Sequence, residues 1–487
     1  MRTLGYLFLL LLFSAPLAAQ RIDVVELPPA TLDELARVAV AAPAGEHAER
    51  PRPALAAPRE TAGAVVAAEL VAIRASGAPP PITRGFRASF DPLPSATTAY
   101  YPADASGAAG PRHVVGAFNN SLSVHDRNGN QLSLLSIYQF WHDPAIPDTF
   151  LYDPRVAYDA ANDRWVLAML TDTNLRQGVL LFAVSATGDP TGTWRRFRYA
   201  AAGDPRLSLD FTRMALTADQ IVITANEYDG NNITGLDLFT IAKSAAFGGG
   251  TPAPAKTHAL GFDATPIASA DTIVRVLFLG DGKLNENRLS DGALTFFATY
   301  TSPVPFGFAQ RVCAQAGSSG QVDCGVTSLH YALLRNGVLW AVQSANDAQR
   351  ARILVWKIGG GAATTYLLSD PNVDYAYPSI AVNRNGAALV GFSTLSGSIY
   401  PSAAYLLIDP AGNVSAAATV KDGERPYGYF RWGDFSTTLV DPVDDLSFWT
   451  LQSYATPPPT TLPFISWGTW WSYVQVKPPP RTRAVRH

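Results

Sequence analysis

Acidic corners with an arginine close by are the residues of this sequence best suited, by type and spacing, to do chemistry. The pairs are Asp153 with Arg155, Asp204 with Arg206, and Asp434 with Arg431. Gathered at one place, their charges could bind an anion or a sugar, and carboxylates together with carbonyl oxygens could bind calcium. The alternative is structural, because an Asp before a strand accepts hydrogen bonds from the backbone N–H groups of its turn, and the Arg can pair with an Asp of an adjacent unit of the same kind. Repetition at equivalent positions favours the structural role.

The stretch 152–169 shows the unit that carries these corners. It reads YDPRVAYDAANDRWVLAM, which is an Asp-Pro corner followed by an apolar strand, a polar turn and a second apolar strand. Aligning similar strands along the chain places repeat starts near Gly110, Asp153, Asp204, Thr265, Ser328, Tyr377 and Asp434. Their mean spacing is a little over about fifty residues, and repeats of roughly this length with about four strands each are typical of β-propellers.

The predicted fold is therefore an all-β propeller with four-stranded antiparallel blades. Seven repeat starts favour seven blades, and six or eight are the alternatives because the third and fourth repeats are long. In a propeller, the loops that lead into the innermost strands lie on the face where ligands usually bind, so the corners are expected at one mouth of the central channel. The last repeat lacks a strand, which a segment near Phe86–Phe90 or Thr97–Tyr101 would supply to close the ring.

The rest of the chain divides into three further parts. Residues 1–19 combine Arg2, a short apolar run and small residues, which predicts a signal peptide and a secreted or periplasmic protein. Residues 20–95 are rich in Ala and Pro and are predicted to form a linker or pro-segment, with short helices after the capping-box pattern at Thr31 and over 62–75. The propeller then occupies 96–477, and a disordered basic tail is expected over 478–487.

Composition excludes several classes of partner. A net charge of −3 gives no basic face for nucleic acid. No segment after the signal peptide is apolar over enough residues to cross a bilayer, and a monomer is expected. The two cysteines, Cys313 and Cys324, are close in sequence, and in an exported protein they are predicted to pair as a disulfide rather than to hold zinc or to react as free thiols.

The run from Tyr101 to Val115, YPADASGAAGPRHVV, resembles an entry motif of secreted bacterial β-propeller proteins, a family of largely uncharacterised function. The segments that continue the resemblance are Asp153 to Trp165, Ile223 to Tyr228, Tyr400 to Ser402, Arg431 to Ser436 and Val440 to Pro442. The resemblance covers roughly residues 101–454 and implies the propeller fold without implying a reaction. The run Leu451 to Tyr454 departs from it, since an Asn-Glu-Tyr-like run is common there, and this argues against Glu-based chemistry at that point.

A sialidase-like glycosidase is the competing interpretation. Arginines near a channel mouth resemble those of sialidase-like propellers, and Ser185 to Trp194 looks like a stretched Asp-box turn of that superfamily. An Asp-box is a folding motif of an outer hairpin, however, and a glycosidase needs a placed acid and a nucleophile. Glu227 with Tyr228 is the one attractive pair in the sequence, so Glu227 joins the channel-mouth candidates.

The sequence therefore predicts an exported propeller that binds a glycan or a protein, or serves as a scaffold. A secreted carbohydrate-active hydrolase or lyase is the alternative. No cofactor is expected, with calcium the one ion that the corners could hold. The aromatic residues of 467–473 could stack on sugars, although at alternating positions of a strand they more often fill the space between blades.

Overall fold

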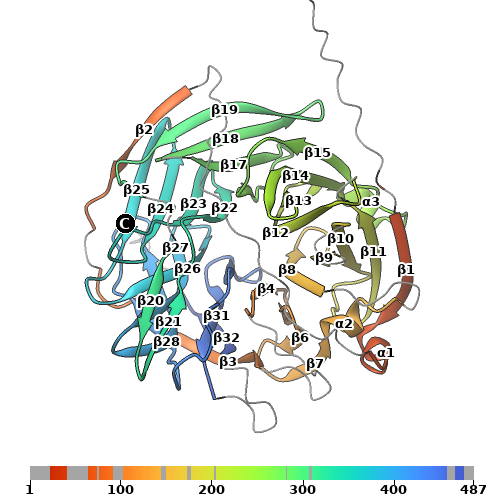
Figure 1. Cartoon of the computed structure of the whole chain (residues 1–487), viewed down its shortest axis with the longest axis horizontal. Coiled ribbons are helices and arrows are strands. Elements are labelled where there is room, and N and C mark those ends of the chain that lie inside the picture. Colours follow the sequence, from red (N-terminus) through yellow and green to blue (C-terminus); the bar gives the residue numbers. More distant parts are fainter. Residues whose placement is uncertain are drawn as a thin grey trace, which may run out of the picture.

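The computed structural model describes residues 22, 24–40, 64–73, 76–90, 102–143, 150–172, 177–201, 204–280, 282–306, 310–457 and 467–476. These residues form an all-β propeller, with antiparallel sheets arranged around a centre (Figure 1). The predicted signal peptide, the basic tail and the segment 97–101 lie outside the described residues. None of the helices in the described part of the chain is long and apolar enough to span a bilayer.

The first sheets follow one another along the chain, each with its innermost strand first. Their strands are β4 (Ser106–Ala109), β5 (His113–Ala117), β6 (Ser121–Asp126) and β7 (Gln131–Ser136); then β8 (Phe150–Asp159), β9 (Arg164–Asp172), β10 (Val179–Ser185) and β11 (Thr193–Ala200); then β12 (Leu207–Leu216), β13 (Gln220–Asp229), β14 (Asn232–Ala242) and β15 (Ala255–Ala259). Short helices α2 (Ile137–Phe140) and α3 (Lys243–Phe247) follow β7 and β14.

The second half continues the same pattern and adds one hairpin. Its strands are β16 (Ala264–Pro266), β17 (Arg275–Gly280), β18 (Lys283–Ser290) and β19 (Ala293–Thr301); β22 (Leu329–Arg335), β23 (Val338–Ser344), β24 (Ile353–Gly359) and β25 (Ala362–Leu368); β26 (Asp374–Val382), β27 (Ala388–Ser396), β28 (Ile399–Ile408) and β29 (Ala418–Lys421); and β30 (Thr437–Val440), β31 (Phe448–Ala455) and β32 (Trp467–Val474). The inserted hairpin consists of β20 (Val312–Gln315) and β21 (Ser318–Asp323).

The innermost strands contact one another in chain order, and β30 contacts β4, which closes the ring. The predicted repeat starts lie near these strands, and the pairing is compatible with the seven repeats counted in the sequence; the blade number itself stays a prediction. Between the sheets lies a core of Val, Leu, Ala and large aromatic side chains, including the fully buried Trp165, Trp356 and Trp471. Stacked sheets bury the faces that one four-stranded sheet would leave exposed.

The segment 20–95 differs from the predicted linker, because three of its stretches are strands of the propeller. Strand β1 (Val24–Thr31) pairs with β11, β2 (Ala64–Leu70) pairs with both β19 and β25, and β3 (Ile82–Phe90) pairs with β32. The ring closure predicted near Phe86–Phe90 is thereby confirmed. The Ala and Pro content of this segment gives it a low intrinsic strand propensity, so these strands could not be predicted from composition. Backbone hydrogen bonds to the edges of existing sheets stabilise them instead.

The two helices expected in this segment have opposite outcomes. Thr31 caps α1 (Leu32–Ala36) in a capping box with Glu34, as predicted. The helix predicted over 62–75 is wrong, because Ala64–Leu70 is the strand β2. Alanine favours a helix in isolation, but the partners on both sides of β2 decide its conformation.

Candidate functional site

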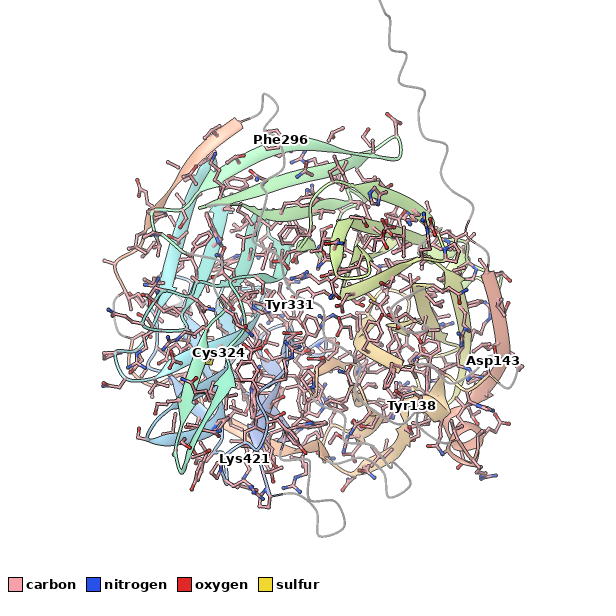
Figure 2. The ribbon with its side chains drawn as sticks, viewed as in Figure 1. Tyr138, Asp143, Phe296, Cys324, Tyr331 and Lys421 are labelled. Atoms are coloured by element: carbon pink, nitrogen blue, oxygen red, sulfur yellow. A yellow bond between two sulfur atoms is a disulfide. The ribbon has the colours of Figure 1, made fainter. Side chains whose placement is uncertain are left out.

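Two buried aromatic side chains from different sheets meet at the centre of the ring. Phe211, from β12, and Phe435, just before β30, are in contact with 5.0 Å between ring centroids and 47° between ring planes. The guanidinium group of Arg155 lies 3.3 Å from the centroid of Phe435, and that of Arg213 lies 4.3 Å from the centroid of Phe211. Tyr331 is labelled beside this centre in Figure 2. Four side chains from three sheets thus form a row at the centre, in which the two aromatic rings lie between the two guanidinium groups.

A backbone feature shared by the repeats places these side chains. One residue with positive φ lies in or before each innermost strand, and these are Asp104, Asp153, Phe211, Asp263, Gly325, Tyr377 and Gly433. In β8, β12 and β26 this residue falls in a β-bulge. A non-glycine residue in this conformation costs roughly 1–2 kcal/mol, so its surroundings must stabilise it.

Asp153 shows how the surroundings do so. Its backbone N–H donates to Asn119 Oδ1 at 2.9 Å, and its Oδ2 accepts from the backbone N–H of Thr212 at 3.3 Å. Asn119 follows β5 in the preceding sheet and Thr212 lies in β12 of the next one. One Asp therefore ties three consecutive sheets together. Burial is the largest cause that raises the pKa of Asp153 well above its ordinary value, and Asp210 adds to it.

Asp263, just before β16, links three consecutive sheets in the same way as Asp153 does, in this case those that begin with β12, β16 and β22. Its N–H donates to Asn226 Oδ1 at 2.9 Å, and its Oδ2 accepts from the backbone N–H of Leu329 at 3.3 Å. Its carboxylate also pairs with the guanidinium group of Arg213. The sequence search missed this residue because Asp263 is followed by Ala264 and lacks the Pro of the corner at Asp153.

Asp104 completes the tie across the ring closure. Its Oδ1 accepts from the backbone N–H of Asp434 at 2.8 Å, and its Oδ2 accepts from Asn119 Nδ2 at 2.8 Å. Burial, and then the neighbouring Asp434, raise the pKa of Asp104 to about 6. The ends of the propeller are therefore bonded at the same level as its other sheets.

Arg431 connects the centre to the inserted hairpin. Its guanidinium group lies 2.9 Å from Asp434 Oδ2 and 3.4 Å from Asp323 Oδ2 at the end of β21. Cys313 and Cys324 form the predicted disulfide, which joins β20 to the residue after β21. The hairpin is fixed further by Gln315 Nε2, which donates to the carbonyl oxygen of Tyr427 at 2.9 Å.

The structure thus brings Asp153, Arg155, Asp434 and Arg431 to the centre, but it places Asp204 and Arg206 elsewhere. These two pair with each other on the surface, with Nη2 of Arg206 2.8 Å from Oδ2 of Asp204. Hydrogen bonds from Arg206 lower the pKa of Asp204 to about 2. Their sequence, Asp-Pro-Arg, is the same as that of residues 153–155. In β8 the bulge falls at this motif, whereas in β12 it lies several residues later, at Phe211.

Glu227 lies in a second charged group, on β13 to β15, rather than with the corners. Asp237 Oδ1 is 3.0 Å from His258 Nδ1, and Glu227 Oε1 is 3.6 Å from the same nitrogen. On the other side, Lys256 Nζ lies 2.7 Å from Asp237 Oδ2 and 3.6 Å from Glu227 Oε2. Thr234 Oγ1 donates to Glu227 at 2.9 Å.

The electrostatics of this group follow from burial and mutual contact. Burial, and then Asp237, raise the pKa of Glu227. The hydrogen bond with Asp237 raises the pKa of His258. Among the described residues, Glu227, Asp237 and His258 are the group of this kind close enough to hold a metal ion. Lys256 already supplies a positive charge to both carboxylates, so the donor set is partly neutralised without an ion.

A third group combines aromatic and charged side chains at the surface. Lys421 Nζ lies 5.2 Å from the ring centroid of Tyr454 and 5.3 Å from that of Trp470. It also lies 2.8 Å from Glu424 Oε1, and Arg87 Nε donates to the hydroxyl of Tyr454 at 3.0 Å. Figure 2 labels Lys421 toward the outer edge of the ring. We call these five residues the Trp470 surface; the ring of Tyr454 is fully buried, and the ring of Trp470 is half-exposed.

The aromatic run 467–473 otherwise fills the interior, as its alternation predicts. Trp467 and Trp471 are fully buried and Tyr473 is buried. Trp470 is only half-buried, and its indole lies against Gly85, where a Cβ would come within 2.6 Å of Nε1. The absence of a side chain at Gly85 on β3 therefore lets the Trp470 indole pack directly against the backbone of the sheet.

The Asp-box-like turn is a folding element. It joins β10 to β11, and Trp194 Nε1 donates to the carbonyl oxygen of Pro190 at 2.8 Å. Asp189 accepts from the backbone N–H of Thr191 at 2.9 Å within the same turn. Strands β10 and β11 lie between β1 and β9 in a five-stranded sheet, away from the innermost strand β8.

A search of protein-family models finds no match to the chain, and a search of curated proteins also finds none. Among solved structures, the chain is similar to the endosialidase of phage phi92, with 8% identity and a TM-score of 0.44 over 83% of this chain and 71% of that one. It is similar to the α-L-arabinofuranosidase Arb93A of Fusarium graminearum, with 10% identity and a TM-score of 0.39 over 80% and 97% of the two chains. It is also similar to the sialidase of Trypanosoma rangeli, with 11% identity and a TM-score of 0.36 over 76% and 60%. Likeness at this level concerns the fold and carries no conclusion about activity.

Proposed function

We propose that this protein is an exported binding propeller that takes a glycan on its surface and does no chemistry at its centre. The observation that carries the proposal is that the charged and aromatic groups at the centre are buried and paired with one another. Asp153 and Asp434 are hydrogen-bonded to neighbouring sheets, the guanidinium group of Arg155 lies over Phe435, and Phe435 packs against Phe211. Charges that are already paired and buried would have to be released before they could bind a ligand.

The Trp470 surface has the side chains that a sugar requires. The half-exposed indole of Trp470 offers apolar surface to the C–H groups of a pyranose, and the charged groups around it can bond the sugar hydroxyls. The ammonium group of Lys421 and the carboxylate of Glu424 supply a donor and acceptors at one place. Their side chains remain 26% and 32% exposed, so they stay accessible while being held in position. A ligand would therefore meet a site that is largely ordered in advance.

The test is a glycan array with the purified wild-type protein, run with and without calcium, followed by titration of any saccharide that binds. Replacing Trp470 by Ala should weaken binding by about tenfold or more, since about 1.4 kcal/mol of stacking corresponds to that factor. Phe430→Ala is the matched control, because Phe430 is an aromatic residue with 44% exposure outside this surface. Equal binding by the Trp470 variant and wild type, with both folded by circular dichroism, would reject the site.

A hydrolase is the second candidate, and the group at Glu227 is the observation in its favour. A carboxyl group whose pKa is raised, with a second carboxylate and a histidine beside it, has the chemistry of a general acid. Incubation of the bound saccharide with wild type and with Glu227→Gln would separate the two functions. Release of reducing ends by wild type that is lost in the Gln variant supports the hydrolase, and an intact saccharide supports the binding protein.

A further inference from the structure

Strand β2 joins two sheets that would otherwise be separate. Residues Ala64–Ala67 pair in parallel with β19, and the next residues, Ala68–Leu70, pair in parallel with β25. Sheets β16–β19 and β22–β25 thereby become one nine-stranded sheet. Figure 1 shows β2 on the perimeter of the ring, next to both strands. Pairings made by β1 and β3 are antiparallel and involve one sheet each.

Side chains anchor β2 only weakly. Ala68 is its one buried residue, whereas Val65 is 72% exposed and Leu70 is 50% exposed. By contrast, β1 buries Leu27 and forms an ion pair between Glu26 and Arg195 at 2.7 Å. What holds β2 is therefore its backbone.

The contacts at the end of β2 show this backbone mode of binding. The N–H of Val71 donates to the carbonyl oxygen of Thr365 at 2.9 Å. The hydroxyl of Thr365 donates to the carbonyl oxygen of Glu69 at 3.2 Å. Main-chain pairing of this kind is how sheet edges accept an extended segment, and an edge left unpaired recruits another strand.

We propose that the adjoining edges of β19 and β25 form a strand-acceptor site, which β2 fills within the chain and which the β2 of a second copy can fill by exchange. The site selects for an extended segment with a small side chain at the position of Ala68, because that residue is buried while Val66 is only partly buried. A second copy is the occupant we infer, since its residues 64–70 have the sequence that the two edges already bind.

The chain is long enough for this exchange. Residues 37–63 separate α1 from β2, and an extended chain of about 27 residues spans roughly 90 Å. Residues 71–81 separate β2 from β3, and about 11 residues span roughly 36 Å once three hydrogen bonds are released. These bonds join Ser76 to Val414, Gly77 to Ala416 and Pro80 to Tyr405. Strand β2 can therefore reach a neighbouring molecule while β1 and β3 stay in place, which is the geometry of a strand-exchanged dimer.

Within one molecule the local concentration of β2 is high, so exchange should require concentrated protein or brief warming. The test uses cysteines at a pair in register, Ala67 on β2 and Thr301 on β19. Because Cys313 and Cys324 are bonded to each other and no free cysteine remains, introduced thiols are the ones available to react. The double variant Ala67→Cys/Thr301→Cys should form its disulfide within a monomer, which checks the register.

The two single variants are then mixed at high concentration, warmed below the unfolding transition, cooled and oxidised. A disulfide-linked heterodimer of Ala67→Cys with Thr301→Cys on a non-reducing gel is the expected result. Thr295→Cys is the matched control partner, since Thr295 is exposed on β19 outside the paired stretch, and it should give no such dimer. The proposal is overturned if the double variant crosslinks internally while mixed single variants stay monomeric, or if the double variant fails to crosslink.

Discussion

Phe211 and Phe435 belong to sheets that are not neighbours in the ring, yet their side chains meet at the centre with 5.0 Å between centroids. Replacing Phe435 by Ala removes this contact and the surface on which Arg155 lies. We expect the free energy of unfolding to fall by about 3–5 kcal/mol, as for other buried Phe-to-Ala changes, measured by urea denaturation. Phe430→Ala should change it by less than about 0.5 kcal/mol, because Phe430 is 44% exposed. Similar losses in both variants would contradict a closing role for the stack.

Asp153 and Asp204 have the same Asp-Pro-Arg context and different roles, so they form a matched pair. Asp153→Ala leaves the N–H of Thr212 buried without its acceptor and places Ala at positive φ. We expect a loss of roughly 2–4 kcal/mol in the free energy of unfolding. Asp204→Ala affects an exposed pair and should stay within about 0.5 kcal/mol of wild type. Equal effects in thermal and urea unfolding would refute the inter-sheet tie.

Asp104 should make stability depend on pH. Its pKa in the folded protein is about 6, above its ordinary value of 3.8, because it is buried beside Asp434. The folded state thus binds this proton more tightly than the unfolded chain does. The stabilisation is complete below about pH 4 and is lost as pH rises through about 6, by at most roughly 3 kcal/mol. Urea denaturation from pH 4 to 7 should show this fall in wild type and a smaller one in Asp104→Asn; parallel profiles would exclude it.

Lys256 gives a test of the charged group on β13 to β15. Its ammonium group is almost fully buried and depends on Asp237 at 2.7 Å. Asp237→Asn should lower the free energy of unfolding by about 3–5 kcal/mol, because a buried cation loses its nearest partner. Removing both charges in Asp237→Asn/Lys256→Met should recover part of this loss. His258→Ala is the milder control, since the His258 side chain is 37% exposed. A double variant as unstable as the single one would mean that charge pairing is not the cause.

The fold could be predicted from the sequence because its signal is repeated. Apolar strands and polar turns recur about every fifty residues, and each copy supports the same period. The closing strand at Phe86–Phe90 was predictable for a different reason, since the last repeat was visibly one strand short. Cys313 and Cys324 were predictable from their closeness alone.

The site was harder, because it depends on where a bulge falls. Asp153 and Asp204 look alike in sequence, but a positive-φ residue at Phe211 moves the inward-pointing position of β12 away from Asp204. A bulge is fixed by pairing with the next strand and by bonds to neighbouring sheets, and neither leaves a local signature. Strand β2 was not predicted for a similar reason. The composition of its seven residues favours a helix, and only pairing with β19 and β25 makes them a strand.

The sheet formed by β3, β32, β31 and β30 has a consequence for the order in which the molecule can assemble. Its first strand comes from near the beginning of the chain and its last three from the end, with β3 and β32 paired over residues about 380 apart in sequence. During synthesis, the earlier sheets can pair as they emerge, but this one must wait for Trp467–Val474. A chain interrupted before that point would lack β32, the strand that pairs with both β31 and β3, and β3 would be left without its partner. This sheet can therefore be completed only by a chain that has been synthesised through Val474.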